Sequence, residues 1–250
     1  MYQIAADLHT HTVVSNHAFN TITEMASKAK SLNYKAIAIT DHGCAMPDSP
    51  HPWYFHNLCS LPDILEGIPV LKGVEANVMG IDGHLDFEQT QLAKLDWVIA
   101  SIHSDCLPGK LTVEQATQLW LRVAENPYVD MIGHSEQAKH IYDYDAVTKV
   151  FAEKNKVVEL NGNSYAVRPE GVGNMQRLAL SCKKNGCKVA LNTDAHSIYH
   201  LEKGVKHLYR MLEEIDFPEE LIINSSGERL LQELKLHNKQ IVHRIGDFLL

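Results

Sequence analysis

Nine side chains of this sequence could bind metal ions together: seven histidines, one glutamate and one aspartate. Each stands where an apolar run gives way to polar residues, and the densest group lies in Asp7-Leu8-His9-Thr10-His11. Because alternate side chains of a strand point to the same face, His9 and His11 can bind one ion. The predicted ligands are His9, His11, His17, His42, Glu75, His103, His134, Asp194 and His196.

The types of these side chains indicate the metal. Imidazole outnumbers carboxylate and no thiolate takes part, a mixture that suits zinc, although manganese and iron accept it too. Nine side chains are too many for one tetrahedral ion. They suffice for three divalent ions if Glu75 bridges two of them.

The elements that position these side chains alternate between short apolar runs and longer segments of helical periodicity. Strands are expected at residues 4–8, 36–40, 70–74, 97–102, 129–133, 157–160 and 188–192, with a weaker one at 221–223. Helices are expected at residues 23–33, 112–125, 145–154, 175–185 and 200–214. Such alternation predicts an α/β fold in which a parallel sheet, surrounded by helices, closes into a barrel.

The ends of several expected helices carry typical capping residues. Thr112 with Gln115 suits an N-terminal capping box, and Asn33 and Gly186 suit C-terminal ends.

The predicted ligands fall at the carboxyl ends of the expected strands, the face on which barrel active sites are built. Predicted ligands follow the first five strands and the seventh: His9 with His11, His42, Glu75, His103, His134, and Asp194 with His196. Residues distant in sequence should therefore converge on one site.

Three further residues have expected roles near this site. Arg168 lies just past the sixth expected strand, the one that offers no ligand, and its planar guanidinium could bind phosphate oxygens. A solvated surface arginine is the alternative. Asp7 and Asp41 precede predicted ligands and could accept their free ring N–H groups, or could be simple turn residues at strand ends.

The segment 44–62 contains four prolines, Pro47, Pro50, Pro52 and Pro62, around Trp53-Tyr54-Phe55. We expect a long loop that is too rich in proline for a helix. Such a loop could form a wall or a lid over the site.

The other eight of the 15 histidines are expected to be surface residues or hydrogen-bonded core groups. His207, His237 and His243 stand in helical, charged surroundings and should be solvated. The remaining ones are His51, His56, His84, His140 and His200.

Composition is typical of one enzyme-sized domain over residues 1–250, with 45% hydrophobic residues. The net charge of -8, without a lysine or arginine stripe, argues against a nucleic-acid partner. Five cysteines without a Cys-x-x-Cys pair suit a reducing compartment. No apolar run reaches 18 residues and no signal peptide is evident, so we expect no membrane association and a cytoplasmic location.

Four segments resemble the motifs of the PHP (polymerase and histidinol phosphatase) superfamily. They are Asp7-Leu8-His9-Thr10-His11-Thr12, Thr40-Asp41-His42-Gly43, Gly73-Val74-Glu75-Ala76-Asn77 and Thr193-Asp194-Ala195-His196. The run from His51 to Asn57 and Ile81-Asp82-Gly83 are similar to the YcdX-like branch of stand-alone phosphatases. The resemblance implies a distorted (β/α)7 TIM-like barrel, a three-zinc centre and a possible homotrimer.

The resemblance also implies how the ligands divide among the ions. His9, His11, Glu75 and Asp194 would hold one ion, and Glu75, His103 and His134 a second. His17, His42 and His196 would hold the third. The branch tends to have proline after the fifth-strand histidine, whereas Ser135 follows His134 here.

A site of this kind would attract anions, because three divalent ions with two carboxylates leave a charge of about +4. Paired metals lower the pKa of a bridging water toward about 7, so a metal-bound bridging hydroxide could attack a phosphate ester. Glu75, Asp194 and Arg168 are the predicted catalytic residues. We predict a phosphomonoesterase acting on a small phosphorylated metabolite, with sugar and nucleotide phosphates ahead of histidinol phosphate.

Two other functions are compatible with these residues. Barrel metallohydrolases that cleave amides or lactones have similar sites but commonly use a bridging lysine, and Lys72, inside the expected third strand, is no convincing bridge. A non-catalytic metal-binding module is the other alternative.

Overall fold

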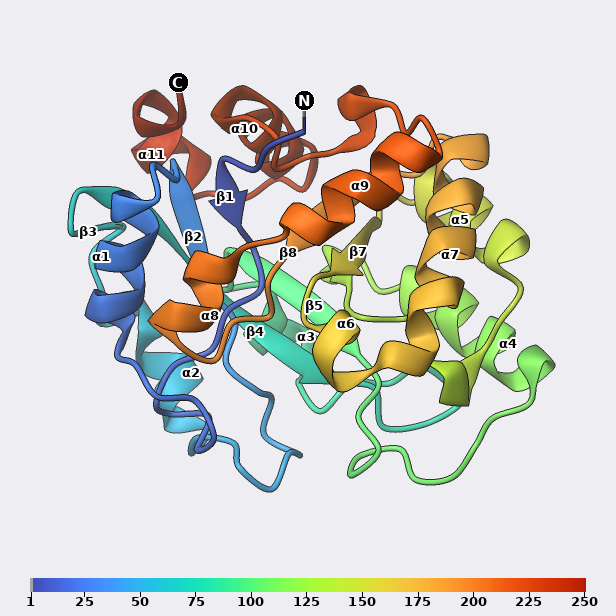
Figure 1. Cartoon of the computed structure of the whole chain (residues 1–250). Coiled ribbons are helices and arrows are strands. Elements are labelled where there is room, and N and C mark those ends of the chain that lie inside the picture. The colour runs from blue at the N-terminus through green and yellow to red at the C-terminus, as the bar shows by residue number, and fades with distance from the viewer. Residues whose placement is uncertain (1) are drawn as a thin grey trace.

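Seven parallel strands form the centre of the molecule in a computed structural model that describes residues 2–250. They are β1 (Ala6–Asp7), β2 (Ala36–Ile39), β4 (Ile68–Asn77), β5 (Trp97–Ser101), β6 (Met131–Ile132), β7 (Val157–Asn161) and β8 (Val189–Asn192), hydrogen-bonded in that order. A short strand, β3 (Ile64–Leu65), pairs antiparallel with β4. Helices surround the strands (Figure 1). The predicted α/β barrel is confirmed.

The barrel is almost closed between its first and last strands. Beyond the strand ends, the His11 amide donates to the Ala195 carbonyl at 2.8 Å. Within the strands, the buried Asn224 side chain bridges the gap by donating to the carbonyls of Ala6 and Leu191, each at 2.8 Å. An asparagine side chain thus replaces the missing backbone ladder between β1 and β8.

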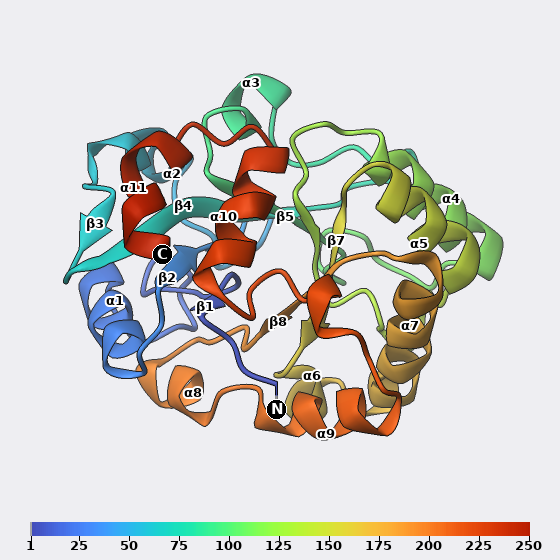
Figure 2. The ribbon, with the colours of Figure 1, turned by 90° about the horizontal axis from the view of Figure 1, so that it is seen from above.

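The end of the barrel formed by the amino ends of the strands is covered by two helices that the sequence did not reveal, α10 (Gly227–Leu236) and α11 (Val242–Leu249). Seen from above, they lie over the strands (Figure 2). Leu230 and Leu234 of α10 and Ile245 of α11 pack with strand residues such as Trp97 in one buried cluster. Apolar side chains therefore close this end of the barrel, and the predicted polar ligands lie at the opposite end.

The longer expected helices are present with small differences in their ends. They are α1 (Ile22–Ser31), α4 (Val113–Ala124), α5 (Tyr144–Glu153) and α7 (Val172–Asn185). Thr112 and Gln115 form the expected capping box, and Gly186 ends α7 in the left-handed conformation at φ 68°. Asn33 also has a positive φ, 62°, just beyond α1.

Two expected elements were wrong. The single helix expected at 200–214 is two helices, α8 (Ile198–Lys203) and α9 (Lys206–Glu214), because Gly204 turns the chain at φ 62° and ψ -159°. The weak strand at 221–223 is a 3-10 turn, Glu219–Leu221, followed by one isolated bridge between Val189 and Ile222. That segment pairs at only one residue because it then turns into α10.

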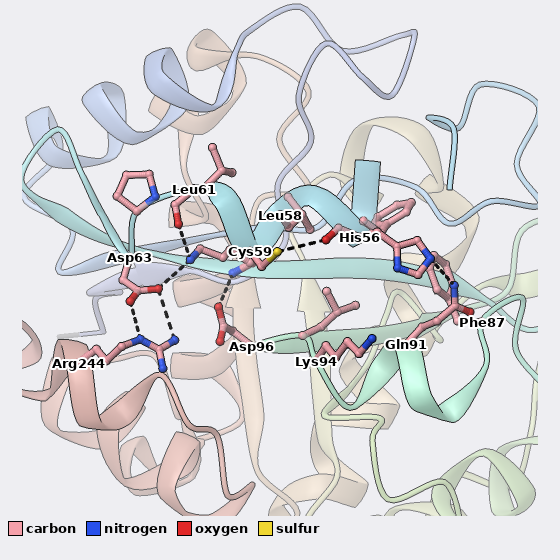
Figure 3. Close-up of a pocket in the computed structure, with 14 residues that line it drawn as sticks. His56, Leu58, Cys59, Leu61, Asp63, Phe87, Gln91, Lys94, Asp96 and Arg244 are labelled. Atoms are coloured by element: carbon pink, nitrogen blue, oxygen red, sulfur yellow. Dashed lines mark hydrogen bonds and ion pairs between the residues drawn. The ribbon is translucent and has the colours of Figure 1, made fainter. Parts of the chain in front are cut away.

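The segment 44–62 was expected to contain no helix, and this expectation is wrong. It contains α2 (Trp53–Asn57) and a 3-10 turn, Leu58–Ser60. The prolines at 47, 50 and 52 all precede α2, where proline removes no helical hydrogen bond. With the four-residue α3 (Gln89–Leu92), these short elements leave a hollow of about 410 Å³ that reaches Lys72 and Arg244 (Figure 3).

Two simpler expectations concern the cysteines and the membrane. All five cysteines are free. Over residues 2–250, none of the helices combines the length and the apolar character that crossing a bilayer requires.

Candidate metal centre

Glu75 lies at the centre of the predicted ligands. Its side chain is fully buried inside β4, two residues before the strand ends, rather than just after it as expected. Oε1 is 2.7 Å from His134 Nε2 and 3.4 Å from the Nε2 atoms of His9 and His103. Oε2 is 3.0 Å from His42 Nδ1 and 3.6 Å from His11 Nε2. One carboxylate therefore faces five imidazoles that follow four other strands.

Asp194 forms a second centre in the turn after β8. Its Oδ1 is 3.2 Å from His11 Nε2 and 3.7 Å from both His9 Nε2 and His196 Nδ1. The rings of His11, His17 and His196 stack with centroid distances of 4.3 Å. The nine predicted side chains are thus gathered at one end of the barrel.

Two of these residues have unusual backbone conformations. His134 has a φ of 26° and Asp194 a φ of 53°. Non-glycine residues in this region cost about 1–3 kcal/mol each, and such strain concentrates at functional sites. Ser135, which follows His134 where the resembled branch tends to have proline, makes a 2.8 Å hydrogen bond with Tyr142.

The ring nitrogens and carboxylate oxygens of the cluster are better suited to bind metal ions than to hydrogen-bond with one another. Among the buried atoms that make no hydrogen bond are Nε2 of His9, both ring nitrogens of His11 and His42, Oε2 of Glu75 and Nε2 of His196. Unpaired polar atoms are costly to bury, and bound cations would satisfy them. Ligand atoms lie within 4.8 Å of one another in the groups His9–His11–Glu75, His42–Glu75–His103 and His11–His42–His196.

A fourth such group includes a carboxylate that the sequence analysis did not name. Asp48, from segment 44–62, joins His17 and His42, and its Oδ2 is 2.7 Å from His17 Nδ1. The same segment contributes Met46 to the wall of the cavity.

Charges in the cluster shift its pKa values in opposite directions. Burial lowers the pKa of His9, but the carboxylates of Glu159, Glu75 and Asp194 outweigh it and raise that pKa well above its usual value. Burial and the neighbouring His196 and His42 hold the pKa of His11 well below its usual value. Burial, with Arg168, lowers the pKa of His134 to about 4. A neutral imidazole is the form that binds a metal.

The residues that orient the histidines are not the expected ones. Glu159 of β7 is 2.7 Å from His9 Nδ1, and Asn77 Oδ1 is 2.6 Å from His103 Nδ1. Gln137 is 3.0 Å from His134 Nδ1. A glutamate inside the apolar run of β7 is the feature of the sequence that could have identified the first of them.

Of the two roles expected for Asp7 and Asp41, the orientation of a ligand ring is wrong, because their partners are backbone and hydroxyl groups. Asp7 accepts hydrogen bonds from the Thr193 hydroxyl and amide, at 2.6 and 3.1 Å, and so joins β1 to β8. Asp41 accepts from Thr12, Ser15 and Tyr54. Asp7 thus joins two strands and Asp41 joins the segments that contain Thr12, Ser15 and Tyr54.

Arg168 lies in the wall of the cavity that contains the centre. Its NH2 group donates to Asp194 Oδ2 at 3.1 Å, and its Nε donates to Ser164 Oγ at 3.1 Å. Only 21% of its side chain is exposed, so Arg168 is not a freely solvated surface residue. The cavity measures about 450 Å³ and also reaches His200 of α8.

His237 differs from the expectation of a solvated side chain. Its ring is 5% exposed and lies 2.8 Å from Asp130 and 3.1 Å from Glu233. His207 and His243 are exposed, as expected.

Comparisons with known proteins add a family and a fold. Residues 7–163 match the family model described as PHP domain. A probable phosphatase of Acetivibrio thermocellus is 37% identical over 239 residues, covering 96% of this chain and 98% of the relative. A probable phosphatase of Caldanaerobacter subterraneus subsp. tengcongensis is 38% identical over 240 residues, covering 96% and 94%.

One solved structure with a similar fold is a histidinol phosphate phosphatase from Lactococcus lactis, complexed with zinc, L-histidinol and phosphate. It superposes with a TM-score of 0.61 over 86% of this chain and 94% of that one. At 18% identity, this likeness concerns the fold.

Proposed function

The chain belongs to the PHP domain family and is a metal-dependent phosphatase, and from that premise we propose that it holds three zinc ions and hydrolyses small phosphate monoesters. The observation that carries the proposal is the arrangement around Glu75. Its two oxygens face histidines on different sides, as a carboxylate that bridges two ions must. A homotrimer, implied by the family resemblance, stays a prediction.

In this proposal, the ligands are the nine predicted residues. His9, His11 and Asp194 would share one ion with Glu75, and His103 and His134 would share a second with it. His42 and His196 would hold the third with His17. The close approach of His11 to His42 and His196, and of Asp48 to His17, supports a compact group of three ions with little space between them.

The ions, when bound, would supply an activated water molecule at neutral pH and neutralise the charge of the phosphate. The protein's own contribution is to hold the phosphate in place. Arg168 is suited to this role. Burial lowers the pKa of its guanidinium, but the charges of Asp194 and Glu136 outweigh that effect and keep the pKa above its usual value, so the group stays charged. Its planar fork can donate two hydrogen bonds to phosphate oxygens.

The amide- or lactone-hydrolase alternative lacks its bridging lysine. Lys72 points away from the centre, and its Nζ donates to Asp63 at 2.7 Å and to the Leu61 carbonyl at 2.8 Å. Both partners lie at the hollow shown in Figure 3. A phosphatase therefore suits the site better. Histidinol phosphate is the second candidate substrate, supported by the fold shared with the Lactococcus lactis enzyme.

The test combines metal analysis with a screen of substrates. Purified protein should contain about three zinc ions per chain and release phosphate from several small monoesters. Histidinol phosphate, sugar phosphates, a nucleoside monophosphate and a lactone should be compared at equal concentration. Turnover of the lactone without phosphate release would contradict the proposal, and a single metal ion per chain in an active enzyme would contradict the three-ion centre.

A further inference from the structure

A second hollow, of about 350 Å³, adjoins the cavity of the metal centre. The two share three lining residues: His103, His134 and Arg168. A phosphate held between Arg168 and the histidines therefore has this hollow directly beside it. Its size is within the range of pockets that bind small molecules.

The walls of the second hollow come from three segments: those that follow β5 and β6, and the turn after α6 (Ser164–Val167). Eight of the ten lining residues are of polar types, and Ile102 and Ala138 are the apolar ones. Its polar side chains, beyond the three shared residues, are Ser104, Asp105, Gln137, Lys139 and Glu170.

These polar groups retain capacity for further hydrogen bonds. Lys139 Nζ donates to Ser104 Oγ at 3.0 Å, which uses one of the three protons of its ammonium group. Gln137 uses its Nε2 group, which donates to the Ile102 carbonyl at 2.9 Å and contacts His134, so its Oε1 remains an acceptor. A ligand here would meet both donors and acceptors.

Charges of both signs line the hollow. Lys139 and Arg168 are cationic, Asp105 and Glu170 are anionic, and an ion held by His103 and His134 would add positive charge beside it. A second phosphate or carboxylate on the ligand would meet Asp105 and Glu170, and an ammonium group would meet Lys139 and that ion. An uncharged group with several hydroxyls avoids both repulsions and can bond to every side chain named.

We propose, on the basis of the phosphatase function proposed above, that this hollow is the subsite for the leaving group and accepts an uncharged, polyhydroxylated one. The substrates of this class are monophosphates of sugars and polyols. Lys139 is the residue that determines the preference. On hydrolysis, water adds to phosphorus, the bond to the ester oxygen breaks, and that oxygen takes up a proton to leave as an alcohol from this hollow.

The test compares two substrates that differ in the leaving group, glucose 6-phosphate and p-nitrophenyl phosphate. For zinc-loaded Lys139→Met, kcat/KM for glucose 6-phosphate should fall about tenfold, the loss expected for one hydrogen bond to a charged group. The value for p-nitrophenyl phosphate, which offers no hydroxyl and whose nitro oxygens are weak acceptors, should fall by less than about threefold. Ser104→Ala should change the ratio in the same direction and to a smaller extent.

Lys110→Met is the matched control, because Lys110 is exposed and lies outside both hollows. It should leave the ratio of the two kcat/KM values as in the wild type. An equal loss on both substrates in Lys139→Met, or no loss on either, would overturn the subsite while leaving the phosphatase function intact. Failure of the zinc-loaded wild type to release phosphate from any monoester would overturn the phosphatase function itself.

Discussion

His9 Nδ1 lies 2.7 Å from Glu159 Oε1, and both side chains are fully buried. This contact fixes the orientation of the His9 ring, so that its Nε2 faces Glu75 and Asp194. Glu159 also accepts hydrogen bonds from the His134 amide, at 2.8 Å, and from Asn192. The strand that offers no predicted ligand thus supports two residues of the proposed centre.

We predict that Glu159→Gln weakens metal binding without unfolding the protein. The amide oxygen can keep the contact with His9, but the side chain lacks the charge that strengthens the imidazole as a ligand. Its NH2 group would also face two donors, the His134 amide and Asn161. Zinc affinity or kcat should fall about 10–100-fold, as is typical when such orienting groups are lost. Glu153→Gln, at an exposed position in α5, is the control. Unchanged zinc affinity and kcat in Glu159→Gln would show that the contact is not needed.

Removal of the metal ions should lower both activity and stability. Several buried ligand atoms make no hydrogen bond within the protein, so without metal they have no partner. A bound metal also stabilises the folded state by mass action. Dialysis against a chelator should abolish phosphate release and lower the melting temperature, and added zinc should restore both. Chelator already saturated with zinc is the control. A chelator-treated sample with no metal by elemental analysis but full activity would contradict metal dependence.

Arg168→Ala should raise KM for a phosphomonoester more than it lowers kcat, if Arg168 binds the phosphate in the ground state as well as the transition state. Loss of a charge-assisted hydrogen bond corresponds to about 1.5–3 kcal/mol, or about 10- to 150-fold in kcat/KM. Arg177→Ala, an exposed position in α7, should behave as the wild type. If KM and kcat stay unchanged in Arg168→Ala, the guanidinium does not bind substrate and only pairs with Asp194.

The gathering of the nine side chains could be predicted because it depends on one rule, that parallel strands share a carboxyl edge. His9, His42, His103 and His134 needed only the approximate ends of their strands, and errors of one or two residues left them at the same face. Glu75 shows that a small error in the end of a strand does not move a side chain away from the site. It lies inside a strand that is longer than expected, and still points to the centre.

What could not be predicted depends on contacts between distant segments. The pairing of His237 with Asp130 joins residues 107 positions apart, and its helical, charged neighbours in sequence suggested a solvated side chain. Likewise, the sequence before α2 is rich in proline, yet the helix begins after the last proline of that run. Local composition indicates the neighbourhood of a residue but not which distant element covers it.

The stability of the barrel should depend on pH through His237. Burial lowers the pKa of its ring, but the facing carboxylates of Asp130 and Glu233 outweigh burial and raise it. Lys239 and Lys188 also face these carboxylates, each at 2.6 Å. Because the folded protein holds this proton more tightly than the unfolded chain, the stabilisation is complete below the unfolded pKa of about 6.5. It is lost as pH rises through the folded pKa.

The corresponding measurement is the free energy of unfolding, by urea, of the wild type and His237→Gln between pH 5.5 and 8.5. The wild type should be more stable by about 1.5–3 kcal/mol at the acidic end, the usual contribution of hydrogen bonds to a charged group. The difference should shrink toward alkaline pH. His243→Gln, at an exposed position, should show no such trend. A difference that is constant with pH would mean that His237 is neutral in the folded protein.

Asn224→Ala should destabilise the barrel at its seam. The side chain accepts from the Leu191 amide at 3.1 Å and donates to the carbonyls of Ala6 and Leu191, so its loss leaves three buried backbone groups unpaired. At about 1–3 kcal/mol for each group, partly offset by entering water, the loss in unfolding free energy should be at least about 2 kcal/mol. Asn57→Ala, at an exposed position with a negative φ at the end of α2, is the control. Because Asp7 and Thr193 join the same two strands nearer the metal centre, zinc content at low denaturant should stay near that of the wild type. Loss of zinc without loss of unfolding free energy would mean that Asn224 acts on the centre rather than on the seam.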